Sequence, residues 1–297
     1  MTAIYSNPGF SDDERRSRLF QGQVFIYETR PESRALVQFA EQLIVEAFDG
    51  LDPETAQHHL PVERFAAILA ELKPRFIHHP QSKELIQALL ASYGCDTDRT
   101  YFDVPRLRSS TSNDYLTTGI AYAFHPHRDT WYSAPLSQVN WWIPVFAVVP
   151  ENVMTFHPRY WDNPVRNGSH RYDYYEWNRT SRFNAAEHIG KDTRDQPKPE
   201  EPIELEPRVT LVPEPGGVMI FSGNQLHSSV PNTSGRTRYS IDFRSVHLDD
   251  VVNRREAPNV DVACTGTTLR DFLRCSDLER MPEDIALAYE NKATAPA

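Results

Sequence analysis

Residues 125–129 place two histidines and one aspartate close together, between a β-prone run at 117–124 and an aromatic-rich run at 139–149. A His-x-Asp unit at the end of a strand can offer one nitrogen and one oxygen to the same metal ion. A second histidine from a distant strand then completes a face of two imidazoles and one carboxylate, which leaves about three metal positions open for substrates. The pair that we single out is His127 and Asp129, and the downstream histidine is His227.

The spacing alone is weak evidence, because a chain with 11 histidines is expected to hold about one His-x-Asp pair by chance. His247 and Asp249 form a second such pair, but no histidine follows them in the sequence. The pair at 127–129 is therefore the one that a later histidine can complete.

A predicted strand at 238–246 adds a second feature. Its alternation places four polar side chains on one face, namely Arg238, Ser240, Asp242 and Arg244. The polar face of a half-buried strand is consistent with a pocket for a carboxylate, which a guanidinium can grip through a pair of hydrogen bonds. Arg238 follows His227 by eleven positions, and Arg236, with the same parity, is its rival.

Composition limits the kind of protein and its partners. The 297 residues are 39% hydrophobic and 24% charged, as in a globular protein. No apolar run reaches the roughly 18 residues that span a bilayer, and residues 1–18 do not resemble a signal peptide. We therefore expect a cytoplasmic protein with no membrane partner. The net charge of -10 argues against nucleic-acid binding, which needs a basic surface.

The cysteines argue against a disulfide framework and against a zinc site. Cys95, Cys264 and Cys275 are odd in number, lie far apart and form no Cys-x-x-Cys unit. This pattern disfavours disulfides and a zinc site, and it fits a reducing compartment.

The first third of the chain is predicted to be mainly helical. After a strand at 23–27, apolar residues recur at helical period over 31–48, with Thr29 and Glu32 at the spacing of a capping box. A helical restart follows Asp52, a helix at 62–73 is expected to stop at Pro74, and another helix is expected at 82–93. A terminal helical region is expected within 269–289.

From residue 100 onward, the pattern changes to short β-prone runs separated by prolines and glycines. The predicted strands are 101–107, 117–124, 139–148, 153–156, 208–212, 218–221, 228–230 and 238–246. Many short strands with turn signals indicate a sandwich or barrel, and helices packed on it give an α+β fold with a mainly β core. The proline-rich stretch 192–206 is interpreted as a surface loop or lid.

The stretch from Leu226 to Arg238 carries a resemblance to a known family, together with the glycines at 216–217 and the His127-x-Asp129 pair. It resembles the iron(II)- and 2-oxoglutarate-dependent oxygenases, specifically the phytanoyl-CoA dioxygenase-like branch. The resemblance covers roughly residues 100–247. It implies a double-stranded β-helix (a jelly-roll, cupin-like) with N-terminal helices packed on the larger sheet. We accordingly expect one catalytic domain over 1–297, with helical support at 1–99, the core at 100–250 and a C-terminal helical extension at 251–297.

The resemblance also implies roles for particular residues. It makes His127, Asp129 and His227 the iron ligands, and it makes Arg238 the partner of the distal carboxylate of 2-oxoglutarate. Helpers in that pocket would be Ser229, Ser240 and one wall residue, Trp141 or Trp142. The cofactors implied are Fe(II), 2-oxoglutarate as cosubstrate, and O2. Halogenating relatives resemble hydroxylases with a small residue in place of the aspartate, so Asp129 favours hydroxylation.

The substrate is expected to be a small polar or anionic molecule. The candidate substrate residues are Arg106, Arg108, Trp131, Asn140, Arg159 and Trp161. We expect hydroxylation of an unactivated C–H bond in a small polar metabolite or natural-product intermediate, with release of succinate and CO2. The same chemistry supports desaturation, epoxidation or cyclisation when the substrate is placed differently. A homodimer is compatible with this interpretation.

Two other classes of function stay open at the level of sequence. One is a cupin-type metal-dependent dioxygenase that uses the same triad without 2-oxoglutarate. The other is a noncatalytic β-sandwich that binds a ligand through its aromatic face. His125 shares strand parity with His127, so it is a candidate ligand, a second donor or a packed residue.

Overall fold

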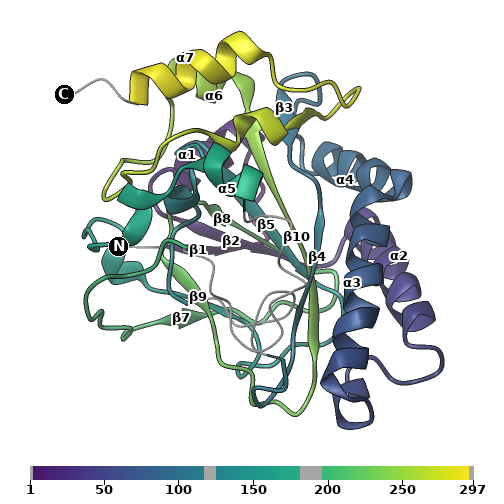
Figure 1. The fold of residues 1–297 in the computed structure, drawn as a ribbon. Coiled ribbons are helices and arrows are strands. Elements are labelled where there is room, and N and C mark those ends of the chain that lie inside the picture. The colour runs from purple at the N-terminus through teal and green to yellow at the C-terminus, as the bar shows by residue number, and fades with distance from the viewer. Residues whose placement is uncertain (1–2, 117–124, 181–195, 294–297) are drawn as a thin grey trace.

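The computed structural model describes residues 3–116, 125–180 and 196–293, and its centre is a large mixed β-sheet (Figure 1). The sheet has eight strands in the order β1-β2-β8-β5-β10-β3-β11, with β4 paired to β10. Their bounds are β1 Ile4–Ser6, β2 Val24–Tyr27, β3 Thr100–Phe102, β4 Arg106–Ser110, β5 Val139–Pro144, β8 Val218–Ser222, β10 Arg238–His247 and β11 Leu273–Arg274. A second sheet has the order β7-β6-β9, formed by β6 Met154–Phe156, β7 Val209–Thr210 and β9 His227–Ser229.

Helices cover one face of the large sheet. Three long helices, α2 Pro31–Ala47, α3 Val62–His78 and α4 Pro80–Ser92, lie side by side next to β4 and β10 (Figure 1). Shorter helices are α1 Asp12–Leu19, α5 Tyr174–Thr180 and α6 Leu248–Asn253, and α7 Glu283–Ala293 packs beside α6. The fold is therefore mixed α+β, as the sequence predicts. No helix in the described ranges is long and apolar enough to cross a membrane.

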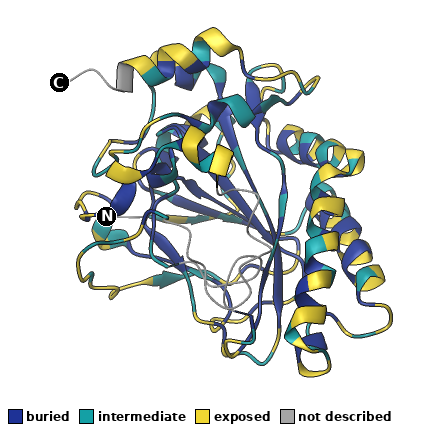
Figure 2. Cartoon of the chain, in the orientation of Figure 1, coloured by how far each residue is buried: buried dark blue, intermediate teal, exposed yellow. Residues whose placement is uncertain are grey.

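Strand β10 separates two environments, because its side chains alternate between the two faces of the sheet. Tyr239, Ile241 and Phe243 are fully buried in the core that the helices share with the sheet. Figure 2 shows that the helices carry both buried and exposed residues, whereas the central strands are mostly buried. The opposite face of β10 carries the polar residues, Arg238 among them. Burial of the apolar side holds that polar face in a fixed position.

A second apolar cluster fills the space on the polar side of the sheet, at one end. It is made of Val24, Trp142, Val148, Val153, Phe156, Met219 and Phe221. These residues come from both sheets, so the small sheet packs against the inner face of the large one. The remainder of that inner face carries charged residues.

Most of the predicted elements are confirmed, with small shifts at their ends. The helices expected at 31–48 and 82–93 are α2 and α4, and Gly94 has the positive φ of 74° that ends α4. The strands expected at 139–148 and 238–246 are β5 and β10. The strand expected at 117–124 lies outside the described residues.

Several expectations about the ends of elements are wrong. Pro74 lies inside α3 rather than after it, because the buried Phe76 keeps the following turn packed on the core. The pair that caps α2 is Arg30 and Ser33, not Thr29 and Glu32. The helical restart after Asp52 is only a 3-10 turn at Ala56–His58.

Other differences concern elements that were joined or missed. The strand expected at 101–107 is divided into β3 and β4 at residues 103–105, which include a proline. β11 stands within the expected terminal helical region, ahead of α7. β1 and α1, near the N-terminus, had no predicted counterpart.

Candidate metal centre

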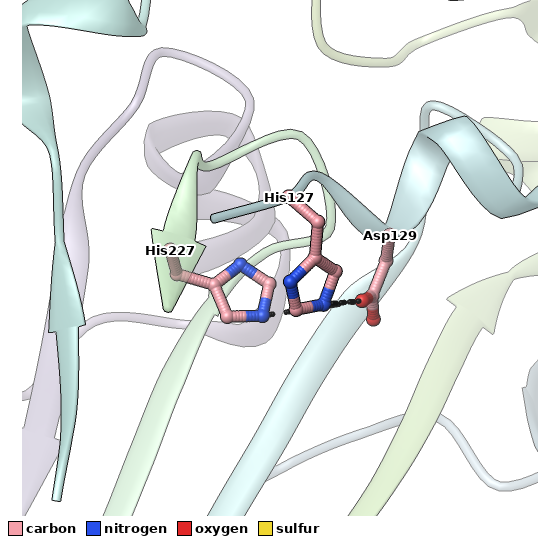
Figure 3. Close-up of side chains that lie close together, drawn as sticks. All are labelled: His127, Asp129 and His227. Atoms are coloured by element: carbon pink, nitrogen blue, oxygen red, sulfur yellow. Dashed lines mark ion pairs between the residues drawn. The ribbon is translucent and has the colours of Figure 1, made fainter. Parts of the chain in front are cut away.

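The side chains of His127, Asp129 and His227 converge on one point, as predicted (Figure 3). A pair of backbone hydrogen bonds joins His127 to His227, with N–O distances of 2.9 and 3.0 Å. This antiparallel bridge brings the two imidazole centroids to 4.4 Å. Asp129 opens a 3-10 turn, and its own amide donates to the carbonyl of Gly223 at 2.9 Å. Backbone pairing between segments about 100 residues apart therefore sets the relative positions of the three side chains.

Each histidine of this cluster is oriented by a backbone carbonyl. Nδ1 of His127 lies 2.8 Å from the carbonyl oxygen of His125, and Nδ1 of His227 lies 3.0 Å from that of Gln225. A carbonyl only accepts, so each Nδ1 donates its N–H to that carbonyl, and each ring turns its Nε2 toward Asp129. The Nε2 atoms lie 3.4 and 3.9 Å from Oδ1 of Asp129. One donor atom from each residue thus lies within 4.8 Å of the others.

This donor set fits a non-haem iron(II) ion. Metal–ligand bonds of about 2.0–2.2 Å place neighbouring donors about 3 Å apart, close to the separations seen here. Two neutral imidazoles and one carboxylate on one side of the ion leave the opposite side open. These three residues would hold the metal.

The charge states of the cluster suit a cation. Burial, followed by the neighbouring His127, lowers the pKa of His227 to about 4. Burial raises the pKa of Asp129, but its contacts with His127, His227 and Asn140 outweigh that effect and hold the value at about 2. At neutral pH the imidazole of His227 is neutral and Asp129 is ionised, so neither has to lose a proton before it binds a metal.

Oδ2, the second oxygen of Asp129, is surrounded by donors. Nδ2 of Asn140 lies at 2.9 Å, Nε2 of Gln138 at 3.2 Å and Nε of Arg244 at 3.5 Å. Asn140 had been predicted as a substrate residue, whereas the structure places it against the carboxylate. Strand parity alone could not show this, because it depends on where the turn that carries Asp129 lies against β5.

Arg238 lies in the interior, 8% exposed, on the polar face of β10. Its Nη1 donates to the carbonyl of Asn152 at 3.0 Å, and its guanidinium carbon lies 5.7 Å from the centre of the Trp142 ring. Its Nε has no hydrogen-bond partner in the described part of the chain, and no carboxylate there forms an ion pair with it. Burial lowers the pKa of Arg238 to about 10. A buried cation with an unused donor is expected where an anion binds.

The other residues predicted for the cosubstrate pocket divide between the two faces of the sheet. Ser240 has the same parity as Arg238, and its buried Oγ has no partner among the described residues. Ser229 is half-buried at the end of β9. Trp142 packs in the cluster between the sheets, close to Arg238. Trp141 points to the helical side, where it stacks on Phe243, so the structure does not bring it to this pocket.

The predicted substrate residues do not form one group. Arg106 and Arg108 are on β4 and pair with Asp103 and Asp242, on the inner face of the sheet. Trp131 is fully buried and donates to Asp261, Trp161 packs against Gly22, and Arg159 pairs with Glu204 at the surface. Only Arg106 and Arg108 of the predicted set therefore remain as candidates in the described residues.

His125 does not belong to the metal cluster. Its Nε2 lies 2.8 Å from the carbonyl oxygen of Pro197, which also accepts a hydrogen bond from the hydroxyl of Tyr132 at 2.9 Å. The described part of the expected loop, residues 196–206, is therefore held at two points. One is the Pro197 carbonyl, and the other is the Leu205 carbonyl, which contacts Nδ1 of His157. His125 and His157 therefore hold this loop rather than bind a metal.

Arg128, between the two proposed ligands in sequence, was not singled out from the sequence. Its fully buried side chain donates to the carboxylate of Asp261 at 3.1 Å and to the carbonyl of Asn224 at 2.6 Å. Asp261 also accepts from the indole of Trp131 at 2.7 Å. The pair fastens the metal-binding turn to the C-terminal segment. The sequence offered one signal for this role, a charged residue between two candidate ligands. The sequence could not identify its partner, because Asp261 lies 133 positions away.

Breaking this pair is expected to unfold the site. Arg128→Met leaves the carboxylate of Asp261 buried without its counter-charge, which typically costs about 3–5 kcal/mol. Urea unfolding measures the change in free energy of unfolding. The double variant Arg128→Met/Asp261→Leu should lose less than the sum of the single variants, since no charge is then left unpaired. Additive losses would show that the two residues do not act as a pair.

Protonation of His125 is expected to make stability depend on pH. Burial, then the nearby His127, lowers the pKa of His125 to about 4, from 6.5 in an unfolded chain. Between these values the unfolded chain binds the proton more tightly, so this contribution to stability is complete above pH 6.5 and is lost as the pH falls through 4.

The test compares wild type with His125→Gln, because other groups titrate in the same range. Burial raises the pKa of Asp103 to about 7, which acts with the opposite sign. The stability of wild type relative to His125→Gln should fall by about 2 kcal/mol between pH 7 and pH 4.5. Urea unfolding at each pH measures it, and a constant difference contradicts the assignment.

A family match over most of the chain, together with the triad, defines an oxygenase of the iron(II)- and 2-oxoglutarate-dependent class. The sequence profile of phytanoyl-CoA dioxygenase (PhyH) matches residues 32–240, a range that includes the triad, Arg238 and Ser240. The chain belongs to the phytanoyl-CoA dioxygenase family.

The solved structures to which this chain is similar are distant in sequence. EvdO2 from Micromonospora carbonacea var. aurantiaca is 11% identical, with 80% of this chain and 92% of that chain covered and a TM-score of 0.45. EvdO2 complexed with 2-oxoglutarate is 12% identical over 59% of this chain and 62% of that chain, with a TM-score of 0.38. The α-ketoglutarate-dependent epimerase SnoN from nogalamycin biosynthesis is 13% identical over 79% and 82%, with a TM-score of 0.38. Among curated protein sequences, none matches this chain.

Proposed function

We propose that this oxygenase hydroxylates an unactivated C–H bond of a small polar or anionic metabolite or natural-product intermediate, with release of succinate and CO2. The observation that carries the proposal is the convergence of His127, Asp129 and His227, with a buried, incompletely bonded arginine on β10, the strand whose Arg244 contacts Asp129. In this proposal the three converging residues hold iron and Arg238 holds the distal carboxylate of 2-oxoglutarate. Asp129 supports hydroxylation over halogenation.

The cosubstrate pocket follows from the unused polar atoms. Nε of Arg238 and Oγ of Ser240 are buried and without partners in the described residues, and both lie on the inner face of β10. A carboxylate placed between them accepts from both, which removes the energetic cost of leaving buried donors unsatisfied. The Trp142 ring beside the guanidinium limits access of water. Bound iron supplies the activation of O2, and these residues fix where the cosubstrate lies relative to it.

The polarity of the substrate is inferred from the rest of the inner face. Arg108 contacts Asp242 at 2.8 and 3.4 Å, and the two side chains are 34% and 18% exposed. Arg106 is 24% exposed beside Asp103. Partly exposed charged pairs near the proposed iron site favour a substrate with polar or ionised groups over a purely apolar one.

We further propose that the two sheets are the halves of a double-stranded β-helix and that residues 1–297 act as one catalytic domain. The bridge between His127 and His227 joins the metal-binding turn to the small sheet. Residues of both sheets share the cluster around Trp142 and Phe156. Limited proteolysis tests the domain boundaries, since a single domain should resist cleavage between the helical and β regions.

The experiment that tests the function is an anaerobic titration of the apo-protein with iron(II), followed by 2-oxoglutarate. We expect a weak visible charge-transfer band when both are bound, and then succinate release during a screen of polar metabolites. Iron binding without a band favours a metal-dependent dioxygenase that does not use 2-oxoglutarate. A protein that is stable and binds no iron rejects the proposal in favour of a noncatalytic binding module.

A further inference from the structure

The two oxygens of Asp129 lie in different surroundings. Oδ1 faces the Nε2 atoms of both histidines of the triad, at 3.4 and 3.9 Å (Figure 3). Oδ2 faces away from them, toward Asn140, Gln138 and Arg244 at 2.9, 3.2 and 3.5 Å. Only Oδ1 is therefore directed at the space between the imidazoles.

The donors around Oδ2 are themselves held in place. Nε2 of Gln138 also donates to Oδ1 of Asn140 at 2.9 Å, which fixes the orientation of both amides. Asn140 and Arg244 stand opposite each other in the pairing of β5 with β10. Asn140 and Arg244 thus stand on two paired strands at the centre of the sheet, and Gln138 lies directly before β5.

Asp103 fixes the guanidinium of Arg244 from the other side. Its carboxylate accepts from the Arg244 amide at 2.7 Å and from Nη1 at 3.2 Å. Arg106 contacts the same carboxylate at 2.6 Å. Arg106 therefore shares a partner with Arg244, but within the described residues no hydrogen bond or ion pair joins Arg106 to Asp129.

The close packing at Gly223 keeps these groups together. Its backbone accepts from the Asp129 amide at 2.9 Å and donates to the Gln138 carbonyl at 3.0 Å. A Cβ at this position would come within 3.0 Å of Nε2 of Gln138 and 3.6 Å of Cβ of Asp129. A side chain here would push the amide away from the carboxylate.

We propose that Asn140, Gln138 and Arg244 are positioning residues that occupy Oδ2, so that Asp129 presents Oδ1 alone to the metal. The inference rests on the proposed ligand role of Asp129. A carboxylate that bound through both oxygens would take one of the positions that 2-oxoglutarate, substrate and O2 need. Contacts of two amides and a guanidinium with Oδ2 prevent binding through both oxygens. That position of the metal then stays open.

The test is Co(II) binding to the full-length apo-protein, followed by equilibrium competition and by visible absorption. Asn140→Leu removes a donor without touching Asp103, and Arg244→Met removes the guanidinium. Arg106→Met is the matched control, because it takes an arginine from Asp103 and leaves Asp129 untouched. Thermal unfolding of each apo-protein shows how much stability each change removes.

We expect Asn140→Leu and Arg244→Met to weaken Co(II) binding by about 10- to 100-fold and to change the intensity of the absorption bands. Arg106→Met should keep the wild-type affinity and spectrum, even where its unfolding temperature falls as much as that of Arg244→Met. Wild-type spectra and affinities in both Asn140→Leu and Arg244→Met overturn the inference. So does an equal loss in Arg106→Met, which would trace the effect to Asp103.

Co(II) binding distinguishes failure of the proposed ligand role of Asp129 from failure of the positioning role of Asn140, Gln138 and Arg244. If the wild-type protein does not bind Co(II), the ligand role of Asp129 is wrong and the proposed function falls together with this inference. If wild type binds Co(II) and the variants bind it equally well, the proposed function stands and the positioning role alone is rejected.

Discussion

Replacement of His227 by alanine is expected to abolish turnover and high-affinity metal binding together. The imidazole is one of three donors that lie within 4.8 Å of one another, and its Nε2 is kept available by the bond from Nδ1 to the Gln225 carbonyl. A metal centre supplies several kcal/mol of barrier lowering, and each 1.4 kcal/mol is about tenfold in rate. We therefore expect at least about a thousandfold loss of succinate release.

Metal content and turnover measured on the same preparation check this prediction. His157→Gln is the matched control, because His157 is a buried histidine at the end of β6 whose ring nitrogens contact Ser228 and Leu205 instead of the triad. It should keep iron and activity while losing some stability. His227→Ala with wild-type iron content and turnover would remove His227 from the ligand set.

Replacement of Arg238 by methionine is expected to weaken 2-oxoglutarate binding without loss of iron binding. Removal of one partner from a buried, hydrogen-bonded charge pair costs about 2–5 kcal/mol, which corresponds to roughly a 30- to 4000-fold rise in the dissociation constant. The visible band in an anaerobic 2-oxoglutarate titration measures this constant. Arg236→Met is the control, because Arg236 has the same strand parity but is exposed and pairs with Glu54.

Arg238→Met should not lower the unfolding temperature of the apo-protein, although it replaces a buried residue. In the apo-protein, Arg238 is a buried cation that lacks a carboxylate partner among the described residues. Such a group opposes folding, so Arg238→Met should unfold at the same temperature as wild type or higher. A large loss of stability, with unchanged affinity for 2-oxoglutarate, would make Arg238 a structural residue and leave the cosubstrate anchor unassigned.

Local patterns in the sequence were sufficient for the helices and strands that depend on short-range periodicity. The helical period over 31–48 predicted α2, and the alternation over 238–244 predicted which face of β10 is polar. These patterns hold because side-chain direction repeats every few residues along a helix or strand. The exception at Pro74 shows the limit, since tertiary packing of Phe76 carried α3 past a residue that usually ends a helix.

The triad could also be predicted from the sequence, because the ligand types, their order along the chain and the following arginine all indicated the same kind of metal site. Trp141 shows where such reasoning stopped. Adjacent tryptophans on one strand point to opposite faces, and the sequence alone did not decide which of the two faces the inner side. The packing of Phe243 and the helices against Trp141 settled that question.

By itself, then, the sequence determined the types and the order of the candidate residues: two histidines and one aspartate for a metal, followed by an arginine that we propose holds 2-oxoglutarate. The tertiary structure decided what supports that chemistry. Asn140 and Arg244 meet Oδ2 of Asp129, and Arg128 meets Asp261, only because distant strands and segments pair in one particular register. Such contacts join residues about 10 to 130 positions apart, and no local period along the chain encodes them.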